Sequence, residues 1–213
     1  MDEKYLRMLC EEPNLFKNLE GGIDIITDPK LINQIEKEHN TSIGVIYEDD
    51  YIILLKDAVR FADLKTGPYI RVYYKSHGGA SIFVTYDDKI LLIKHFRHSL
   101  RRWIWETPRG FTDAGESSAE TAVREMSEEL GVTVSTIEYL GDIFPDAGII
   151  GEHVSLYCAK LNSCDKIRTE EHEGIKEIGL FSKEEFIAAI KSGEIADGIT
   201  IASFTLATLK GVI

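Results

Sequence analysis

Hydrophobic and polar residues along the chain group into many short runs that predict β-strands. These runs are rich in Ile, Val and Tyr and are separated by turn-forming residues such as Gly67-Pro68 and Asp87-Asp88, a pattern typical of strands. The two runs that flank Glu48-Asp49-Asp50 are expected to form a hairpin. The predicted strands span residues 42–47, 51–56, 69–75, 81–86, 89–95, 101–107, 137–143, 153–161 and 174–181.

Helical periodicity is clearest between residues 118 and 130, where no proline or glycine interrupts the run. Ser117 and Glu120 have the spacing of a capping box, and Gly131 stands where a helix takes a left-handed cap. An apolar stripe along this helix is expected to pack on a sheet. The stripe consists of Ala119, Ala122, Val123, Met126 and Leu130.

Further helices are predicted over residues 29–39, from Ser182 to residue 191, and over residues 197–210. Strands in mixed order combined with these helices predict an α/β fold, in which a mixed sheet is covered by helices on its faces. The first 40 residues are expected to form an N-terminal helical extension, and residues 41–213 a single domain. A chain of 213 residues, 44% of them hydrophobic, can bury a core of that size.

Composition narrows the classes of function. A formal net charge of −12 argues against broad binding to nucleic acid or anionic membranes, which requires a basic surface. No apolar run approaches the roughly 20 residues that span a bilayer, and the N-terminus does not read as a leader. A cytoplasmic location is the default expectation. The three cysteines show no metal-ligand spacing and are expected to be reduced.

Three carboxylates lie together on the helix predicted over residues 118–130. Glu125, Glu128 and Glu129 stand at i, i+3 and i+4, where like charges repel by roughly 0.2–0.5 kcal/mol per pair. A divalent cation would reverse this repulsion, and carboxylate clusters suit Mg²⁺ or Mn²⁺. The alternative is a solvated acidic helix face with no ligand.

The complete stretch from Gly110 to Val132 resembles the Nudix box, the signature of hydrolases that act on nucleoside diphosphates linked to another moiety. Every defining position of the box is filled. The resemblance implies a Nudix α/β/α sandwich and hydrolysis of a pyrophosphate bond. The leading expectation is a nucleoside diphosphate sugar as substrate, with ADP-ribose converted to AMP and ribose 5-phosphate.

The same resemblance implies roles for individual residues. Glu125 and Glu129 would bind two or more Mg²⁺ ions (Mn²⁺ being a possible replacement), Glu128 would share an ion or its water, and the Arg109 carbonyl would complete a site. The acidic stretch 170–173 resembles the loop that supplies a catalytic base, which falls on Glu171 or Glu173. Its alternative is a mobile acidic loop.

Residues flanking the box resemble the substrate-binding segments of ADP-ribose pyrophosphatases. Glu106-Thr107-Pro108-Arg109-Gly110 matches a Glu-x-Pro-x-Gly sequence, although Arg109 stands where a small residue is usual; its side chain would reach a phosphate or else point to solvent. Arg97 resembles an arginine that contacts substrate, with a plain surface charge as the alternative. Glu152, in a loop that is similar to the one following the box, would contact a phosphate-bound metal or water, or else is an ordinary carboxylate at a strand start.

Two other functions stay open at this point. The chain could hydrolyse a different nucleotide derivative, such as NADH, a dinucleoside polyphosphate or another sugar nucleotide. It could also be a non-catalytic nucleotide-binding regulator, which the intact set of glutamates disfavours. The family resemblance further implies a homodimer that exchanges strands within residues 41–75, and a small-molecule partner in place of nucleic acid or membrane.

Overall fold

The computed structural model describes residues 2–76, 78–163, 167 and 174–213. The chain divides into two compact units. The first comprises residues 1–75 together with Asp146–Glu152, and the second comprises Ser76–Pro145 and His153–Ile213. The units therefore divide after Lys75, later in the chain than the boundary expected after residue 40.

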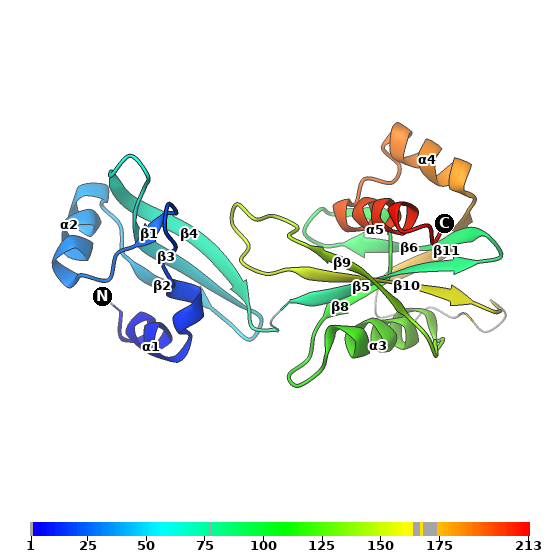
Figure 1. The fold of residues 1–213 in the computed structure, drawn as a ribbon, viewed down its shortest axis with the longest axis horizontal. Coiled ribbons are helices and arrows are strands. Elements are labelled where there is room, and N and C mark those ends of the chain that lie inside the picture. The colour runs from blue at the N-terminus through cyan, green and yellow to red at the C-terminus, as the bar shows by residue number, and fades with distance from the viewer. Residues whose placement is uncertain (1, 77, 164–166, 168–173) are drawn as a thin grey trace. The chain divides into compact units, whose positions relative to one another are not determined.

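The first unit is an antiparallel sheet with helices packed on it (Figure 1). The central strand β3 (Ile52–Arg60) pairs with β2 (Gly44–Glu48), β4 (Thr66–Tyr74) and the short β1 (Asp24–Ile25). The β2–β3 pairing confirms the predicted hairpin. The helical elements are α1 (Glu3–Glu11), the 3₁₀ turn η1 (Pro13–Phe16) and α2 (Pro29–His39).

A buried ion pair attaches the N-terminal residues to this sheet. Asp57 on β3 is almost fully buried, and it accepts hydrogen bonds from the Arg71 guanidinium on β4 and from the Tyr5 hydroxyl on α1. Arg71 also donates to the Leu15 carbonyl at 2.6 Å and to the Tyr73 hydroxyl at 2.6 Å. Removing one partner of such a pair typically costs about 3–5 kcal/mol. The N-terminal helices are thus an integral part of the first unit.

The second unit is built on a mixed sheet. Among the described residues this sheet contains seven strands, five of them in the order β11-β6-β5-β10-β9. Strands β5 and β10 run parallel and the other neighbours antiparallel. The short strand β7 pairs with β6, and β8 pairs with β5. The bounds are β5 Gly79–Tyr86, β6 Lys89–Arg97, β7 Arg102–Glu106, β8 Arg109–Phe111, β9 Glu138–Ile143, β10 Val154–Leu161 and β11 Ile175–Phe181.

Helices cover both faces of this sheet (Figure 1). Helix α3 (Ser118–Leu130) lies on one face, where Met126 and Leu130 pack with inward residues of β5, β6 and β10. On the opposite face, α4 (Lys183–Ser192) and α5 (Gly198–Leu209) enclose a second core that contains Phe83. The predicted α/β/α sandwich with a mixed sheet is confirmed. Helix α3 begins and ends where its capping signals predicted.

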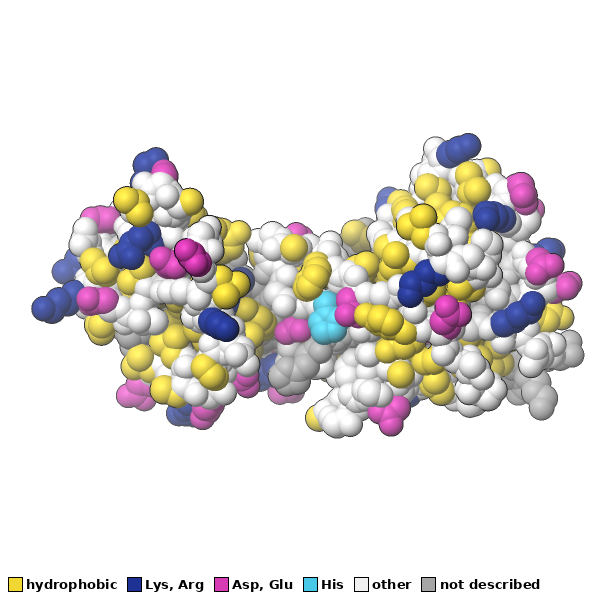
Figure 2. Space-filling view, in the orientation of Figure 1, with side chains coloured by type: hydrophobic (Ala, Val, Ile, Leu, Met, Phe, Trp, Pro, Cys, Tyr) yellow, Lys and Arg dark blue, Asp and Glu magenta, His cyan; other side chains and the backbone are white. Residues whose placement is uncertain are grey.

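The visible surface of each unit carries acidic and basic side chains interspersed with hydrophobic ones (Figure 2). The excess negative charge therefore does not gather into one acidic patch on this face. In the described part of the chain, no helix is both long and apolar enough to cross a membrane. Cys10 and Cys158 are free thiols, the first exposed and the second buried.

Candidate active site

The carboxylates of α3 lie in two different environments. Glu125 and Glu129 are 8% and 2% exposed, whereas Glu128, between them in the sequence, has a half-exposed side chain. A solvated acidic helix face would expose all three. Since Glu125 and Glu129 are buried, the structure rules out that alternative for them. Burying a carboxylate is costly without compensation.

Gly110 shows how closely the helix and the loop before it approach each other. This glycine lies on β8, opposite Ala80 of β5. A Cβ atom added to Gly110 would stand 1.9 Å from Oε1 of Glu125, so any other residue at this position would displace the carboxylate. The glycine of the box therefore makes room for the first buried glutamate.

Arg124 forms hydrogen bonds with three glutamates of the box. Its guanidinium donates to Glu116 Oε1 at 3.1 Å, to Glu125 Oε1 at 2.7 Å and to Glu128 Oε2 at 2.6 Å. It also donates to the Phe111 carbonyl at 2.8 Å, and its acidic partners raise the pKa of Arg124. Glu116 and Arg124 thus form an ion pair between the loop of the box and its helix. Arg124 in addition neutralises part of the charge of Glu125 and Glu128.

Of the three carboxylates on α3, Glu125, Glu128 and Glu129, the last is the least compensated by positive charge. Burial, followed by the nearby charges of Glu125 and Glu106, raises the pKa of Glu129 to about 9. Its Oε2 accepts a hydrogen bond from the Arg109 backbone N–H, at 3.1 Å. Two buried carboxylates side by side, one of them so weakly compensated, suit a hard divalent cation. In the described residues, however, no three acidic, His or Cys side chains already converge as a metal site.

Glu106 forms a second charged centre, at the end of β7. This carboxylate is fully buried. Arg97 Nη2 lies 2.7 Å and His95 Nδ1 2.9 Å from its Oε1, while Arg97 Nε and Arg109 Nη2 reach Oε2 at 3.0 and 2.9 Å. Burial alone would raise the pKa of Glu106, but the His95 hydrogen bond and the two arginines outweigh it and hold that pKa below its ordinary value. Glu106 thus stays ionised inside the protein.

Arg109 neither points to solvent nor stands free to reach a phosphate. Its Nη1 lies 2.9 Å from both carboxylate oxygens of Asp197, and its Nη2 bonds Glu106. Asp197 precedes α5 and caps it. The sequence signalled the start of a helix at this position but gave no sign of a partner 88 positions away. Asp197 is therefore a site residue that sequence reasoning missed.

The structure brings together six of the predicted site residues, Arg97, Glu106, Arg109, Glu125, Glu128 and Glu129, all in the second unit. Glu171 and Glu173 lie outside the described residues. Gly174, which follows Glu173 directly, accepts the Phe96 backbone N–H at 3.0 Å, next to Arg97. Glu152 belongs to the segment that packs with the first unit, so its role in the site stays a prediction.

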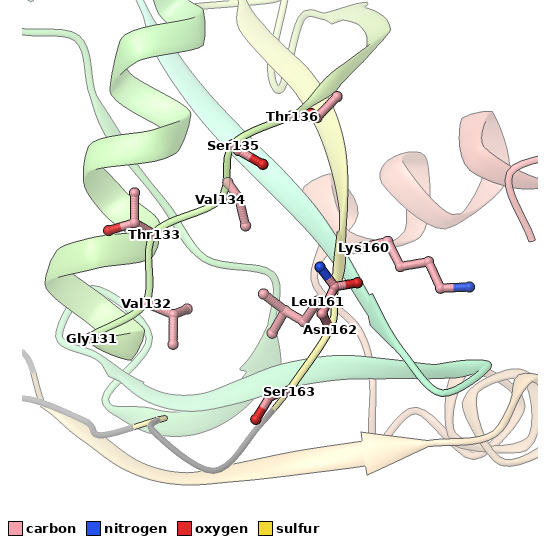
Figure 3. A pocket seen from close by; sticks show the side chains of 10 residues that line it. All are labelled: Gly131, Val132, Thr133, Val134, Ser135, Thr136, Lys160, Leu161, Asn162 and Ser163. Carbon is pink, nitrogen blue, oxygen red and sulfur yellow. The ribbon is translucent and has the colours of Figure 1, made fainter.

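Two hollows lie near α3. A cavity of about 630 Å³ follows the C-terminal end of the helix and is lined by residues 131–136 and 160–163 (Figure 3). Of the site residues that the structure describes, Arg97, Glu106, Arg109, Glu125, Glu128, Glu129 and Glu152 are all absent from this lining. A smaller hollow of about 280 Å³ is lined by the box loop from Thr112 to Glu116, with Gly79 and His153 opposite. Through Glu116, which pairs with Arg124, this second hollow adjoins the carboxylate cluster.

Comparison with known proteins shows which family this chain resembles. A family model described as "NUDIX domain" matches residues 75–203. An ADP-ribose pyrophosphatase of Mycobacterium tuberculosis is 34% identical over 130 residues, which are 59% of this chain and 63% of that protein. An ADP-ribose pyrophosphatase of Bacillus subtilis is 28% identical over 155 residues, covering 71% of this chain and 84% of that protein.

A solved structure described as an ADP compounds hydrolase has the same fold. It superposes with a TM-score of 0.63 at 16% sequence identity, over 78% of this chain and 91% of that chain. At this level of identity the likeness supports the fold alone.

The raised pKa of Glu129 predicts a pH-dependent effect of Glu129→Gln on the metal-free protein. The folded pKa of about 9 exceeds the ordinary value of 4.5, so folding keeps a proton on Glu129 and the wild type loses stability as the pH rises between these values. The variant, which cannot ionise, is expected to be more stable at pH 8, by at least about 1 kcal/mol, and little changed at pH 5. Calorimetry in EDTA checks this, with the exposed Glu194→Gln as control. An equal effect at both pH values would contradict it.

Proposed function

The chain belongs to the NUDIX family, and from that premise we propose that it hydrolyses the pyrophosphate bond of a nucleoside diphosphate sugar. The proposed substrate is ADP-ribose, and the products are AMP and ribose 5-phosphate. Two relatives named ADP-ribose pyrophosphatases support this choice. The observation that carries the proposal is the pair of buried carboxylates of α3: Glu125 packs against Gly110, and Glu129 accepts the Arg109 backbone N–H.

NUDIX hydrolases generally use divalent metal ions, and the donor set here fits them. Glu125 and Glu129 would hold two or more Mg²⁺ ions, or Mn²⁺, with Glu128 and the Arg109 carbonyl as further ligands. When bound, these ions neutralise the diphosphate and lower the pKa of the attacking water. Glu125 and Glu128 each bond Arg124 in the present structure, and they would give up part of these contacts to hold the ions.

The protein's own groups orient the reaction. The Arg109 backbone N–H binds one oxygen of Glu129, and the other oxygen would be the one to bind a cation. Arg97, whose side chain is 28% exposed, would contact the anionic substrate, since it has N–H donors beyond the two that bind Glu106. Glu106 holds both arginines in place. Glu152 would bind a phosphate-bound ion or water.

Glu129→Gln is expected to abolish hydrolysis, because the variant keeps the shape of the side chain but, unlike Glu129, cannot release a proton and bind the cation as a carboxylate. A phosphate-release assay coupled to a phosphatase, run with and without Mg²⁺ over a panel of nucleotide derivatives, measures this. The panel contains ADP-ribose, other sugar nucleotides, NADH and dinucleoside polyphosphates. Glu194→Gln serves as control and should behave as wild type. Unchanged turnover in Glu129→Gln would contradict the role of Glu129 as a metal ligand.

The same panel separates the alternatives. Preferred turnover of another compound would replace ADP-ribose within the same chemistry. Tight binding of one nucleotide without turnover of any would favour a non-catalytic regulator.

Glu171 or Glu173 is proposed as the base that deprotonates the attacking water. Single Glu171→Gln and Glu173→Gln variants are expected to differ, with one losing about 100-fold or more in kcat at saturating metal. Glu170→Gln, in the same stretch, provides the matched control. Normal kcat in both variants would exclude the acidic stretch as the source of the base.

We further propose a homodimer formed through residues 41–75. Several large hydrophobic side chains on this part of the first unit are exposed, among them Ile46, Tyr47, Tyr51, Tyr69 and Ile70, and such a surface favours association. Light scattering at micromolar concentration is expected to give twice the chain mass of 24.0 kDa. The mass of a single chain would contradict the dimer.

A further inference from the structure

Arg109 lies between two carboxylates that come from distant parts of the chain. Glu106 is three residues away on β7, whereas Asp197 lies at the start of α5. The side chains of Arg109 and Asp197 are only 15% and 11% exposed. At this depth an ion pair is screened much less than one at the surface, so Asp197 contributes strongly to where the Arg109 guanidinium lies.

The start of α5 holds the preceding loop at a second point. Thr200 Oγ1 accepts the backbone N–H of Thr107 at 3.0 Å and donates to Asp197 Oδ2 at 2.8 Å. The same Asp197 oxygen accepts the Thr200 backbone N–H at 2.9 Å. The segment Thr107-Pro108-Arg109 is therefore fixed to one end of α5 by both backbone and side-chain contacts.

On its other side this segment supports the carboxylate cluster. The Pro108 carbonyl accepts the Ile82 backbone N–H at 3.0 Å, which holds the segment on β5. The next residue, Arg109, then directs its backbone N–H to Glu129 Oε2. Arg109 therefore bonds Glu129 through its backbone and Asp197 through its side chain.

We propose that Asp197 is a positioning residue of the active site. It holds Arg109 so that the Arg109 backbone N–H orients Glu129, and it thereby sets the affinity of the carboxylate cluster for a divalent cation. This inference rests on the proposed metal-dependent hydrolysis and extends it to a residue outside the box. Groups that orient a metal ligand typically change metal affinity 10–100-fold when removed.

Asp197 also caps α5, and suitable variants separate the two roles. Ser and Asn both cap helices well. Asp197→Ser keeps a capping oxygen but is too short to reach Arg109, while Asp197→Asn keeps the length and loses the charge. Asp28 offers a matched control, because it caps α2 through the Lys30 backbone N–H, so Asp28→Ser makes the same change at a cap in the first unit.

The test measures Mn²⁺ binding without substrate in wild type and the three variants. Electron paramagnetic resonance of the free ion reports how much Mn²⁺ is bound. Asp197→Ser is expected to bind Mn²⁺ about 10-fold more weakly or worse, Asp197→Asn to fall between it and wild type, and Asp28→Ser to match wild type. In the hydrolysis assay, Asp197→Ser should need more Mg²⁺ for half-maximal rate and recover most of kcat at saturating Mg²⁺. Calorimetry of each variant reports the effect on capping separately.

Mn²⁺ affinity in Asp197→Ser equal to that of wild type would overturn the positioning role. A wild type that binds no Mn²⁺ would overturn it as well. If Mn²⁺ binding depends on Asp197 but no compound of the panel is hydrolysed, the positioning role stands and the proposed function fails. The two ideas therefore fail through different measurements.

Discussion

The burial of three carboxylates within one small region is the constraint on which the site depends. Glu106, Glu125 and Glu129 are each less than a tenth exposed. An isolated ionised carboxylate is unfavourable in a protein interior unless cations and hydrogen bonds compensate it. Two arginines surround Glu106 and Arg124 bonds Glu125. Glu129 has mainly a backbone N–H. Positive charge is therefore distributed unevenly over the three carboxylates, and Glu129 receives the least of it.

The fold supplies this arrangement by joining elements from both faces of one sheet. Helix α3 brings its glutamates from one face, and α5 on the other face brings Asp197. The segment before Gly110 runs between them at the edge of β5, with a contact to each. Both contacts involve largely buried groups. Helix α5, which carries no box residue, is therefore joined through this segment to a glutamate of the box.

Local signals in the sequence predicted most of the fold, and tertiary pairing accounts for what they missed. The ends of α3 followed from Ser117, Glu120 and Gly131, since caps depend on neighbouring residues only. Strands β1 and β8 were not predicted because two or three residues carry no periodicity. Helical spacing placed the glutamates together, but it does not tell which of them are buried. The contact between Arg109 and Asp197 joins residues too far apart for any local pattern to reveal.

The two arginines of the site differ in what they can offer to a substrate. Arg109 lies between Glu106 and Asp197, so a phosphate approaching it meets two carboxylates for one positive charge. Arg97 pairs with a single carboxylate of the described residues, Glu106, and has the more exposed side chain of the two arginines. Since Glu106 divides its charge between both arginines and His95, Arg97 keeps more of its positive charge available. Recognition of an anionic substrate is thus better suited to Arg97, and organisation of the carboxylate cluster to Arg109.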